Sequence, residues 1–226
     1  MRRTAVWLLV LGLELGSRTV LAGAPARAAV LSWEKTFGRA AVKPTVHLRA
    51  KVLDRKGQER SLEVWREGER RLKRSDGLLD IQVEDTGRPG APAYVWVLAD
   101  RTDHTVHRLT AEQAVRLGPA YTWWSLAHLL DLPGPSYTLE RLSEPGPVVE
   151  TGRCDWYLFT PDGQPGTRIC WSREFAVPLR IDERQGSGWR TRLSAESIGP
   201  FRPTDPAFQL DTVGLRAVAP PAPDED

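Results

Sequence analysis

Polar and hydrophobic residues alternate with a period of two along most of this chain, a pattern typical of half-buried β-strands. The alternation is clearest over residues 45–52, where valine, leucine and alanine alternate with histidine, arginine and lysine. Residues 94–98 are apolar on both faces, which predicts a central strand covered on both sides. Further strands are predicted around Leu62 and Val64 and over residues 70–74, 79–84, 104–109, 137–142, 177–182 and 189–194.

Three stretches have the spacing of helices instead. Val30, Trp33 and Phe37 predict an amphipathic helix before the first strand, and two short helices are predicted over residues 111–117 and 122–132. The gaps between strands are too short for a helix after each one, which excludes a parallel α/β fold. The predicted class is therefore mainly β (α+β): an open, half-barrel antiparallel sheet with a few short helices covering its concave face.

Two cysteines, the only ones in the chain, flank the turn sequence Pro161-Asp162-Gly163. A hairpin centred on Asp162 places Cys154 opposite Cys170, which predicts a disulfide across the hairpin. Such a bridge, closing a loop of about 15 residues, is worth roughly 3 kcal/mol in the chain-entropy model. The spacing is not that of a redox pair, so the bridge is interpreted as structural and as a sign of an oxidising compartment.

The first 28 residues have the pattern of a secretory signal peptide. Two arginines precede an apolar stretch over residues 5–15, and small residues near Ala22 and Ala28 offer cleavage sites. Ala24 stands where a lipoprotein signal would carry its lipidated cysteine. We therefore expect a periplasmic protein that is exported, cleaved and not lipid-anchored.

The remaining chain is predicted to form one half-barrel domain over residues 29–216, followed by a disordered acidic tail over residues 217–226. Removal of residues 1–28 takes away four arginines and one glutamate, which changes the formal net charge from +2 to −1. A chain with this charge is not expected to bind nucleic acid. The basic stretch between Arg49 and Arg74 is interrupted by acidic residues, and we interpret it as the solvated side of strands.

No pattern of an enzyme or a metal site was found. His104 and His107 are three residues apart on a predicted strand and point to opposite faces, while His128 is predicted on the solvent side of a helix or at its boundary. The chain has no Gly-x-Ser-x-Gly elbow and no glycine-rich phosphate loop. We expect no catalytic residue, no metal and no cofactor.

Aromatic residues from separate elements form the candidate site. A strongly curved sheet leaves a concave apolar surface that a few short helices can cover. The side chains expected to line this hydrophobic cavity are Leu48, Val64, Trp96, Trp123, Trp124, Phe159 and Trp171. Val30, Trp33 and Phe37 are expected to form a lid helix over it. The alternative is that these side chains are an ordinary core.

Several segments together resemble the LolA-like outer-membrane lipoprotein-sorting proteins, a family of periplasmic lipoprotein carriers. The segments are residues 94–100 (YVWVLAD), 124–130 (WSLAHLL), 152–158 (GRCDWYL), 169–174 (ICWSRE) and 177–181 (VPLRI). The resemblance spans roughly Val30 to Leu210. It implies an open half-barrel whose concave face binds acyl chains, and a ligand-gating arginine that aligns with no single arginine here.

These observations lead to two hypotheses. The first is a monomeric, non-enzymatic periplasmic carrier for the acyl chains of lipoproteins or other lipids, which takes part in outer-membrane lipoprotein sorting with an inner- or outer-membrane transport partner. The second, implied by the RseB-like relatives of the same fold, is a sensor or interaction module that binds a protein partner or a lipid signal. A carrier should co-purify with lipid, whereas a sensor should capture one defined protein.

Overall fold

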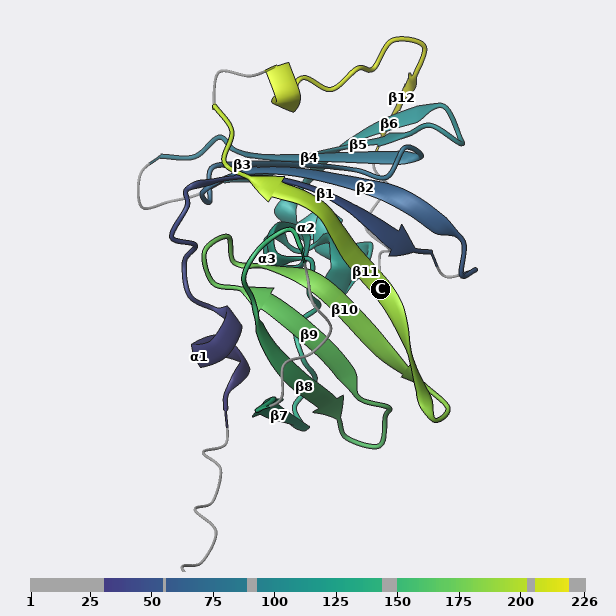
Figure 1. Ribbon diagram of the computed structural model, residues 1–226. Helices are drawn as coiled ribbons and strands as arrows, with labels where there is room; N and C mark the ends of the chain where they lie inside the picture. Colours follow the sequence, from purple (N-terminus) through teal and green to yellow (C-terminus); the bar gives the residue numbers. More distant parts are fainter. Residues whose placement is uncertain (1–30, 55, 89–92, 144–149, 203–205, 220–226) are drawn as a thin grey trace, which may run out of the picture.

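The computed structural model describes residues 31–54, 56–88, 93–143, 150–202 and 206–219. Within these ranges one twelve-stranded sheet has the order β12-β6-β5-β4-β3-β2-β1-β11-β10-β9-β8-β7 (Figure 1). Its strands are β1 (Thr45–Leu53), β2 (Glu59–Glu67), β3 (Arg71–Ser75), β4 (Leu79–Asp85), β5 (Tyr94–Asp100), β6 (Thr105–Thr110), β7 (Tyr137–Arg141), β8 (Asp155–Pro161), β9 (Thr167–Ser172), β10 (Val177–Gln185), β11 (Gly188–Gly199) and β12 (Arg216–Val218). The helical elements are α1 (Trp33–Phe37), α2 (Ala111–Arg116), α3 (Trp123–His128) and the 3₁₀ turns η1 (Pro119–Tyr121) and η2 (Pro206–Phe208). The predicted mainly β class is confirmed.

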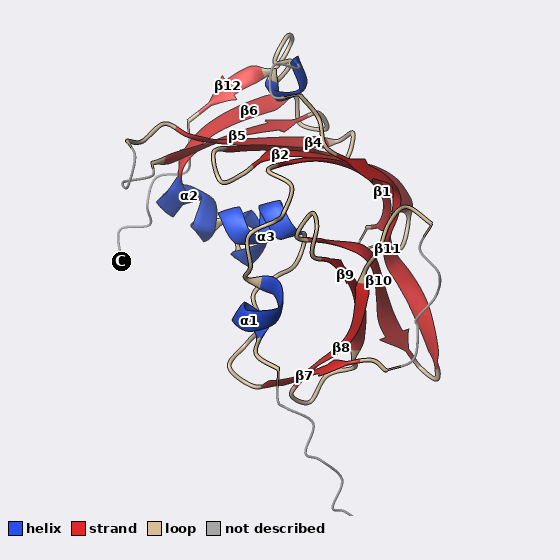
Figure 2. Ribbon diagram, turned by 60° about the vertical axis from the view of Figure 1, so that its left-hand side comes forward, coloured by secondary structure: helices blue, strands red, loops and turns tan. Residues whose placement is uncertain are grey.

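The sheet bends strongly, and α1, α2 and α3 lie within its curve (Figure 2). Strands β1 and β11 join the half made of β2–β6 to the half made of β7–β10. Register shifts interrupt the pairing of β1 with β11, of β10 with β11 and of β10 with β9. Because an extra residue on one strand bends a sheet and increases its twist, these three irregularities account for the curvature near the join.

The predicted alternation sets the two faces of strands β1–β6. Leu48, Val64, Arg74, Ile81 and Leu98 are register partners across five of these strands. Such partners lie on the same face. We call this the inner face because its apolar members pack in one core with residues of α2 and α3. The opposite, outer face carries most of the charged residues of the same strands.

Two hydrophobic clusters divide the interior. The first cluster joins β1–β6 and β8–β11 to α2 and α3, and includes Leu48, Val64, Leu72, Trp96, Leu126, Ala127, Trp156 and Cys170. The second cluster joins α1 to β7, β8 and β9, and includes Trp33, Phe37, Leu130, Leu139, Tyr157, Ile169 and Trp171. Strands β8 and β9 therefore contribute to both clusters with alternate side chains.

The helices of the middle segment are shorter than predicted. Helix α2 begins after the N-cap Thr110, whose side chain and that of Gln113 form a capping box. Helix α3 ends at His128, not at residue 132, because Leu129 adopts a left-handed conformation with φ of 54°. As a result Leu130 leaves the face of α3 and joins the second cluster.

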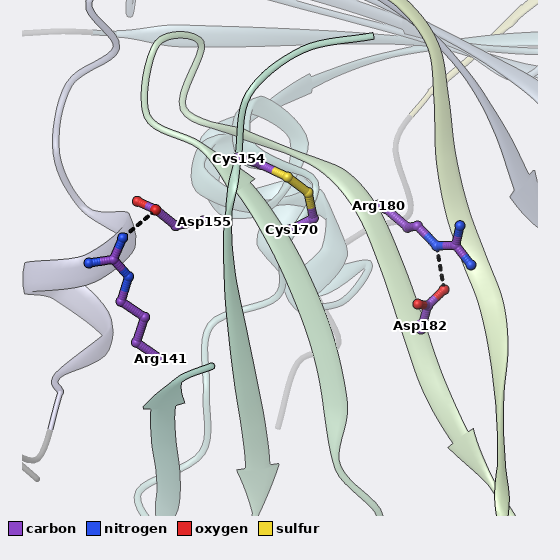
Figure 3. Close-up of a disulfide and its surroundings, with 6 residues drawn as sticks. All are labelled: Arg141, Cys154, Asp155, Cys170, Arg180 and Asp182. Carbon is purple, nitrogen blue, oxygen red and sulfur yellow. Dashed lines mark hydrogen bonds and ion pairs between the residues drawn. A yellow bond between two sulfur atoms is a disulfide. The ribbon is translucent and has the colours of Figure 1, made fainter. Parts of the chain in front are cut away.

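The hairpin of β8 and β9 contains the predicted disulfide, but its register was predicted wrongly. Trp156 lies opposite Cys170, and Cys154 precedes β8 and reaches Cys170 diagonally with a Cα–Cα distance of 5.3 Å (Figure 3). The turn centres one residue later than expected because Gly163 adopts a φ of 67°, which glycine does readily and Asp162 does not. This shift moves every pair along the hairpin.

Two further expectations, about the strand over residues 94–98 and about the start of the tail, differ from the structure. The strand β5 is third from one edge and not central, and its outer residues Val95 and Val97 are half-buried. Ala217 and Val218, assigned from sequence to the tail, lie in β12, which pairs with β6 in a parallel arrangement. Residues 220–226 and the predicted signal peptide lie outside the described residues.

Candidate functional site

The residues predicted to form the cavity are all in the interior, but in two groups. Leu48, Val64, Trp96 and Trp123 belong to the first cluster. The second cluster contains Trp33, Phe37, Trp124, Phe159 and Trp171, whereas Val30 lies outside the described residues. Most are deeply buried: Trp96 and Trp171 are each 2% exposed.

Helix α1 lies within the curve of the sheet (Figure 2), and its aromatic side chains belong to the second cluster. The ring of Trp33 lies 5.0 Å from that of Phe159, and the ring of Phe37 lies 5.0 Å from that of Trp171. The backbone N–H of Trp33 donates to the Tyr137 hydroxyl at 2.9 Å. A helix of five residues has little stability of its own, so α1 is held by this burial and by its Ser32 N-cap.

Three tryptophans bury polar groups without a partner. The indole N–H groups of Trp33, Trp96 and Trp124 have no hydrogen-bond acceptor among the described residues. Two of these groups are in the second cluster and one is in the first. A buried donor that lacks an acceptor costs roughly 1 to 3 kcal/mol. An acceptor placed beside any of these three N–H groups would remove this cost.

A buried arginine connects the two halves of the sheet to α3. Arg66 on β2 is 4% exposed, and its guanidinium donates to the carbonyl of Ala127 at 2.6 Å and to that of Ala176 at 3.3 Å. It also donates to the carbonyl of Phe175. Ala127 lies in the last turn of α3, where helix carbonyls attract a cation, and the other two carbonyls lie in the turn between β9 and β10.

The charge of Arg66 has only neutral acceptors among the described residues. Burial lowers its pKa to about 10, so the side chain remains a cation at neutral pH. A cation without a carboxylate partner is held by three carbonyls alone. Any movement of α3 away from the sheet would break one of these bonds and expose the guanidinium to water.

His128 lies against this arginine at the end of α3. Its Nδ1 is 2.7 Å from the carbonyl oxygen of Ala176, which requires Nδ1 to carry a proton and donate it. The 3.3 Å approach of Arg66 Nη1 to Nδ1 is then a close contact between two donors. Burial, and next the charge of Arg66, lower the pKa of His128 to about 4, while the bond to Ala176 opposes this shift. The imidazole is therefore neutral at neutral pH.

A second arginine, Arg74 on β3, also points to the inner face. Among the described residues it makes no hydrogen bond, and burial lowers its pKa while the charges of Asp76 and Asp131 and the phenol of Tyr121 act in the opposite direction. Its register partners Val64 and Ile81 are apolar. The inner face thus presents two cations in an apolar surface.

Sequence reasoning missed both arginines. The basic stretch was interpreted as a solvated face, which holds for Arg49 and Lys51 but is wrong for Arg66 and Arg74. The signal was present, because Arg66 follows Leu62 and Val64 at the inward positions of one strand. His128 ends α3, which is one of its two expected positions, and its half-buried ring lies 3.9 Å from that of Trp124.

A cavity of about 500 Å³ lies at the start of β7, and Tyr137, which packs against the second cluster, is one of its lining residues. The start of β7 and the turn between β8 and β9 line it, with mostly hydroxyl, amide and proline groups. The lining residues are Pro135, Ser136, Tyr137, Thr138, Thr160, Pro161, Asp162, Gly163 and Gln164.

The described residues form neither a metal cluster nor a membrane-spanning helix. Across the described ranges, no three histidine, cysteine, aspartate or glutamate side chains gather in a way that could hold a metal ion. In the same part of the chain, every helix is too short or too polar to cross a membrane.

Comparison with known proteins gives no family assignment. No family model matches the chain, and no curated protein matches it by sequence. The fold resembles solved structures of MucB. A MucB crystal structure has 19% identity and a TM-score of 0.46, covering 79% of this chain and 62% of that chain. The Pseudomonas aeruginosa MucA/MucB complex has 17% identity and a TM-score of 0.43, covering 77% of this chain and 58% of that chain. The crystal structure of MucB in complex with MucA(peri) has 15% identity and a TM-score of 0.40, covering 77% of this chain and 56% of that chain.

The chain thus spans less than two thirds of each of these MucB chains. What the structure itself establishes is the class: an open, antiparallel-rich half-barrel with short helices inside its curve. No comparison identifies the chain as a lipoprotein carrier.

Proposed function

We propose that this chain is a periplasmic binding module whose concave face receives an apolar segment of a partner protein when α1 and α3 move away. The observation that carries the proposal is the set of three buried indole N–H groups without acceptors. A peptide offers a carbonyl at every residue, whereas the hydrocarbon of an acyl chain offers none. Donors spread over two clusters favour a ligand with acceptors along its length.

Helix α1 indicates which chemistry the second cluster accepts. Trp33 and Phe37, four residues apart, place two rings against Phe159 and Trp171. A partner segment with two aromatic residues at helical spacing would fill the same volume if α1 moved away. Since α1 has only five residues, its replacement by a longer amphipathic segment would bury more apolar surface.

The buried arginine supports a cover that opens. Arg66 holds α3 to the sheet through neutral carbonyls, which are weaker partners than carboxylates. The disulfide between Cys154 and Cys170 keeps the β8–β9 wall intact while the helices move, and a disulfide suits the oxidising compartment that we propose.

Native mass spectrometry of the chain purified from its own host would test the proposal. We expect one protein partner per chain, and Trp124→Phe, which removes the indole N–H and leaves a smaller aromatic ring, should weaken capture about fivefold. Trp189→Phe is the matched control, because Trp189 lies outside both clusters and stacks with Arg168. Equal capture by the two variants, or no protein partner, would contradict the proposal.

The acyl-chain carrier is the second candidate function, and the apolar inner face with its two arginines favours it. An anionic lipid could place its head group near Arg74 and its chains along Val64 and Ile81. In the same mass spectra, a bound lipid without a protein partner would support this candidate. Trp96→Asp should then abolish the lipid signal, because it would place a carboxylate in the first cluster.

A further inference from the structure

The last described segment of the chain crosses the outer face of the sheet, on the side opposite α1, α2 and α3 (Figures 1 and 2). It starts with η2 (Pro206–Phe208) and ends with β12 (Arg216–Val218), which pairs with β6. We call Pro206–Val218 the C-terminal strap. Its position is unrelated to the candidate site on the concave face.

One side chain anchors the strap. Phe208 is 6% exposed and is the only buried residue between positions 206 and 219. Its ring lies 4.2 Å from the guanidinium carbon of Arg71 on β3 and 5.7 Å from the ring of Phe201. Phe208 belongs to neither hydrophobic cluster. The anchor is therefore independent of the two cores.

Two further cations hold the strap through its backbone. Lys73 Nζ donates to the carbonyl oxygen of Gln209 at 3.0 Å, and Arg101 Nη2 donates to that of Asp211 at 2.6 Å. Backbone carbonyls are common to all sequences, so these two contacts accept any extended chain of suitable direction. Only the aromatic position demands a particular kind of residue.

Strand β12 pairs with only half of the outer edge of β6. Strand β6 has six residues, but β12 pairs only with Thr105, Val106 and His107. Residues 108–110 have no strand on that edge within the described ranges. The β12–β6 pair is parallel, a slightly weaker arrangement than an antiparallel pair, and two of its three residues are exposed. In this register a longer incoming strand would pair next with Arg108 and Leu109, since the Thr110 N–H already bonds to the Gln113 side chain.

We propose that Arg71, Lys73, Arg101 and the outer edge of β6 form a docking surface for an extended segment of a partner protein, and that the C-terminal strap occupies it in the absence of that segment. The partner segment carries an aromatic residue for Arg71, an extended backbone for Lys73 and Arg101, and then a strand that pairs along β6. The strap itself shows that a segment of this chemistry fits.

Fluorescence anisotropy with a labelled peptide of residues 206–219 (PAFQLDTVGLRAVA) would test the exchange. The full chain with Phe208→Ala should bind this peptide at least tenfold more tightly than the unaltered chain, whose own strap competes. Val213→Ala is the control, because Val213 is 87% exposed on the same strap, and this variant should behave as the unaltered chain does. Adding Lys73→Met to Phe208→Ala should weaken binding again.

Arg216→Pro is a second way to release the strap, because it removes the N–H that donates to the carbonyl of His104. It should increase peptide binding even if Phe208→Ala does not fold. The proposal would be overturned if the released and unaltered chains bound the peptide equally well. It would also be overturned if a released chain bound the peptide and its Phe208→Ala version equally well. A strap-exchanged dimer of the unaltered chain in light scattering would also overturn it, because the occupant would then be a second copy. None of these results depends on the partner sought under Proposed function.

Discussion

At the residue scale, Arg66 is the buried cation that links α3 to the sheet. It donates to carbonyls of α3 and of the β9–β10 turn, so one guanidinium connects three elements that are distant in sequence. His128, which packs beside it, is kept neutral by burial and by the arginine's charge. The two side chains should respond differently to substitution and to pH.

Replacing Arg66 by methionine should lower the free energy of unfolding by roughly 2 to 4 kcal/mol, because the buried carbonyls of Ala127, Phe175 and Ala176 lose their donor. Urea titration would measure this change, and hydrogen exchange should become faster in α3. Arg49→Met is the control, since Arg49 is exposed on β1 and should change stability by less than about 0.5 kcal/mol. Similar losses in the two variants would contradict this role of Arg66.

The lowered pKa of His128 predicts a loss of stability in acid. The unfolded chain takes up this proton near pH 6.5 but the folded chain only near pH 4, so unfolding becomes easier as the pH falls through that window. The full difference between these two pKa values corresponds to roughly 3 kcal/mol in the free energy of unfolding. His128→Asn keeps a donor for Ala176 but does not titrate. Urea titrations at pH 7 and pH 4 should show a smaller acid loss in this variant, and equal losses would refute the prediction.

At the element scale, the β8–β9 hairpin serves two cores at once. Trp156 and Cys170 face the first cluster, while Tyr157, Ile169 and Trp171 face the second. Ion pairs between Arg141 and Asp155 and between Arg180 and Asp182 lie beside the disulfide (Figure 3). An error in the hairpin would therefore disturb both clusters.

Removal of the disulfide by the double change Cys154→Ala and Cys170→Ala should lower the free energy of unfolding by roughly 3 kcal/mol, because the unfolded chain regains the entropy of a loop of about 15 residues. Urea titration would give the value. The unaltered chain in a reducing agent should show a comparable decrease, whereas the variant should not respond to the reductant. An unchanged midpoint in both would contradict the prediction.

At the scale of the whole molecule, one continuous sheet joins the two clusters through the pairing of β1 with β11. Neither half has a sheet of its own, since the first cluster contains residues from both. The chain should therefore unfold in a single cooperative transition. Tryptophan fluorescence and far-ultraviolet circular dichroism should give the same urea midpoint. Two separate midpoints would show that the halves are independent units.

The sequence alone was sufficient to predict the mainly β class, the positions of most strands and the disulfide partners. These features depend on local spacing, on turn residues and on the presence of only two cysteines. The residues predicted to line a cavity lie in the interior in two hydrophobic clusters, and this division was not predictable from the sequence. That division depends on where α3 ends and on the side of the sheet that α1 covers.

Tertiary structure alone decided the roles of Arg66, His128 and the C-terminal strap. A basic residue on a strand is solvated or buried according to which face the helices cover, and helix placement depends on contacts between residues more than 60 positions apart. The strap is set by three cations that its own sequence does not reveal. Local patterns determine elements because neighbouring residues share one backbone geometry, whereas the pairing of distant surfaces exists only once the chain has folded.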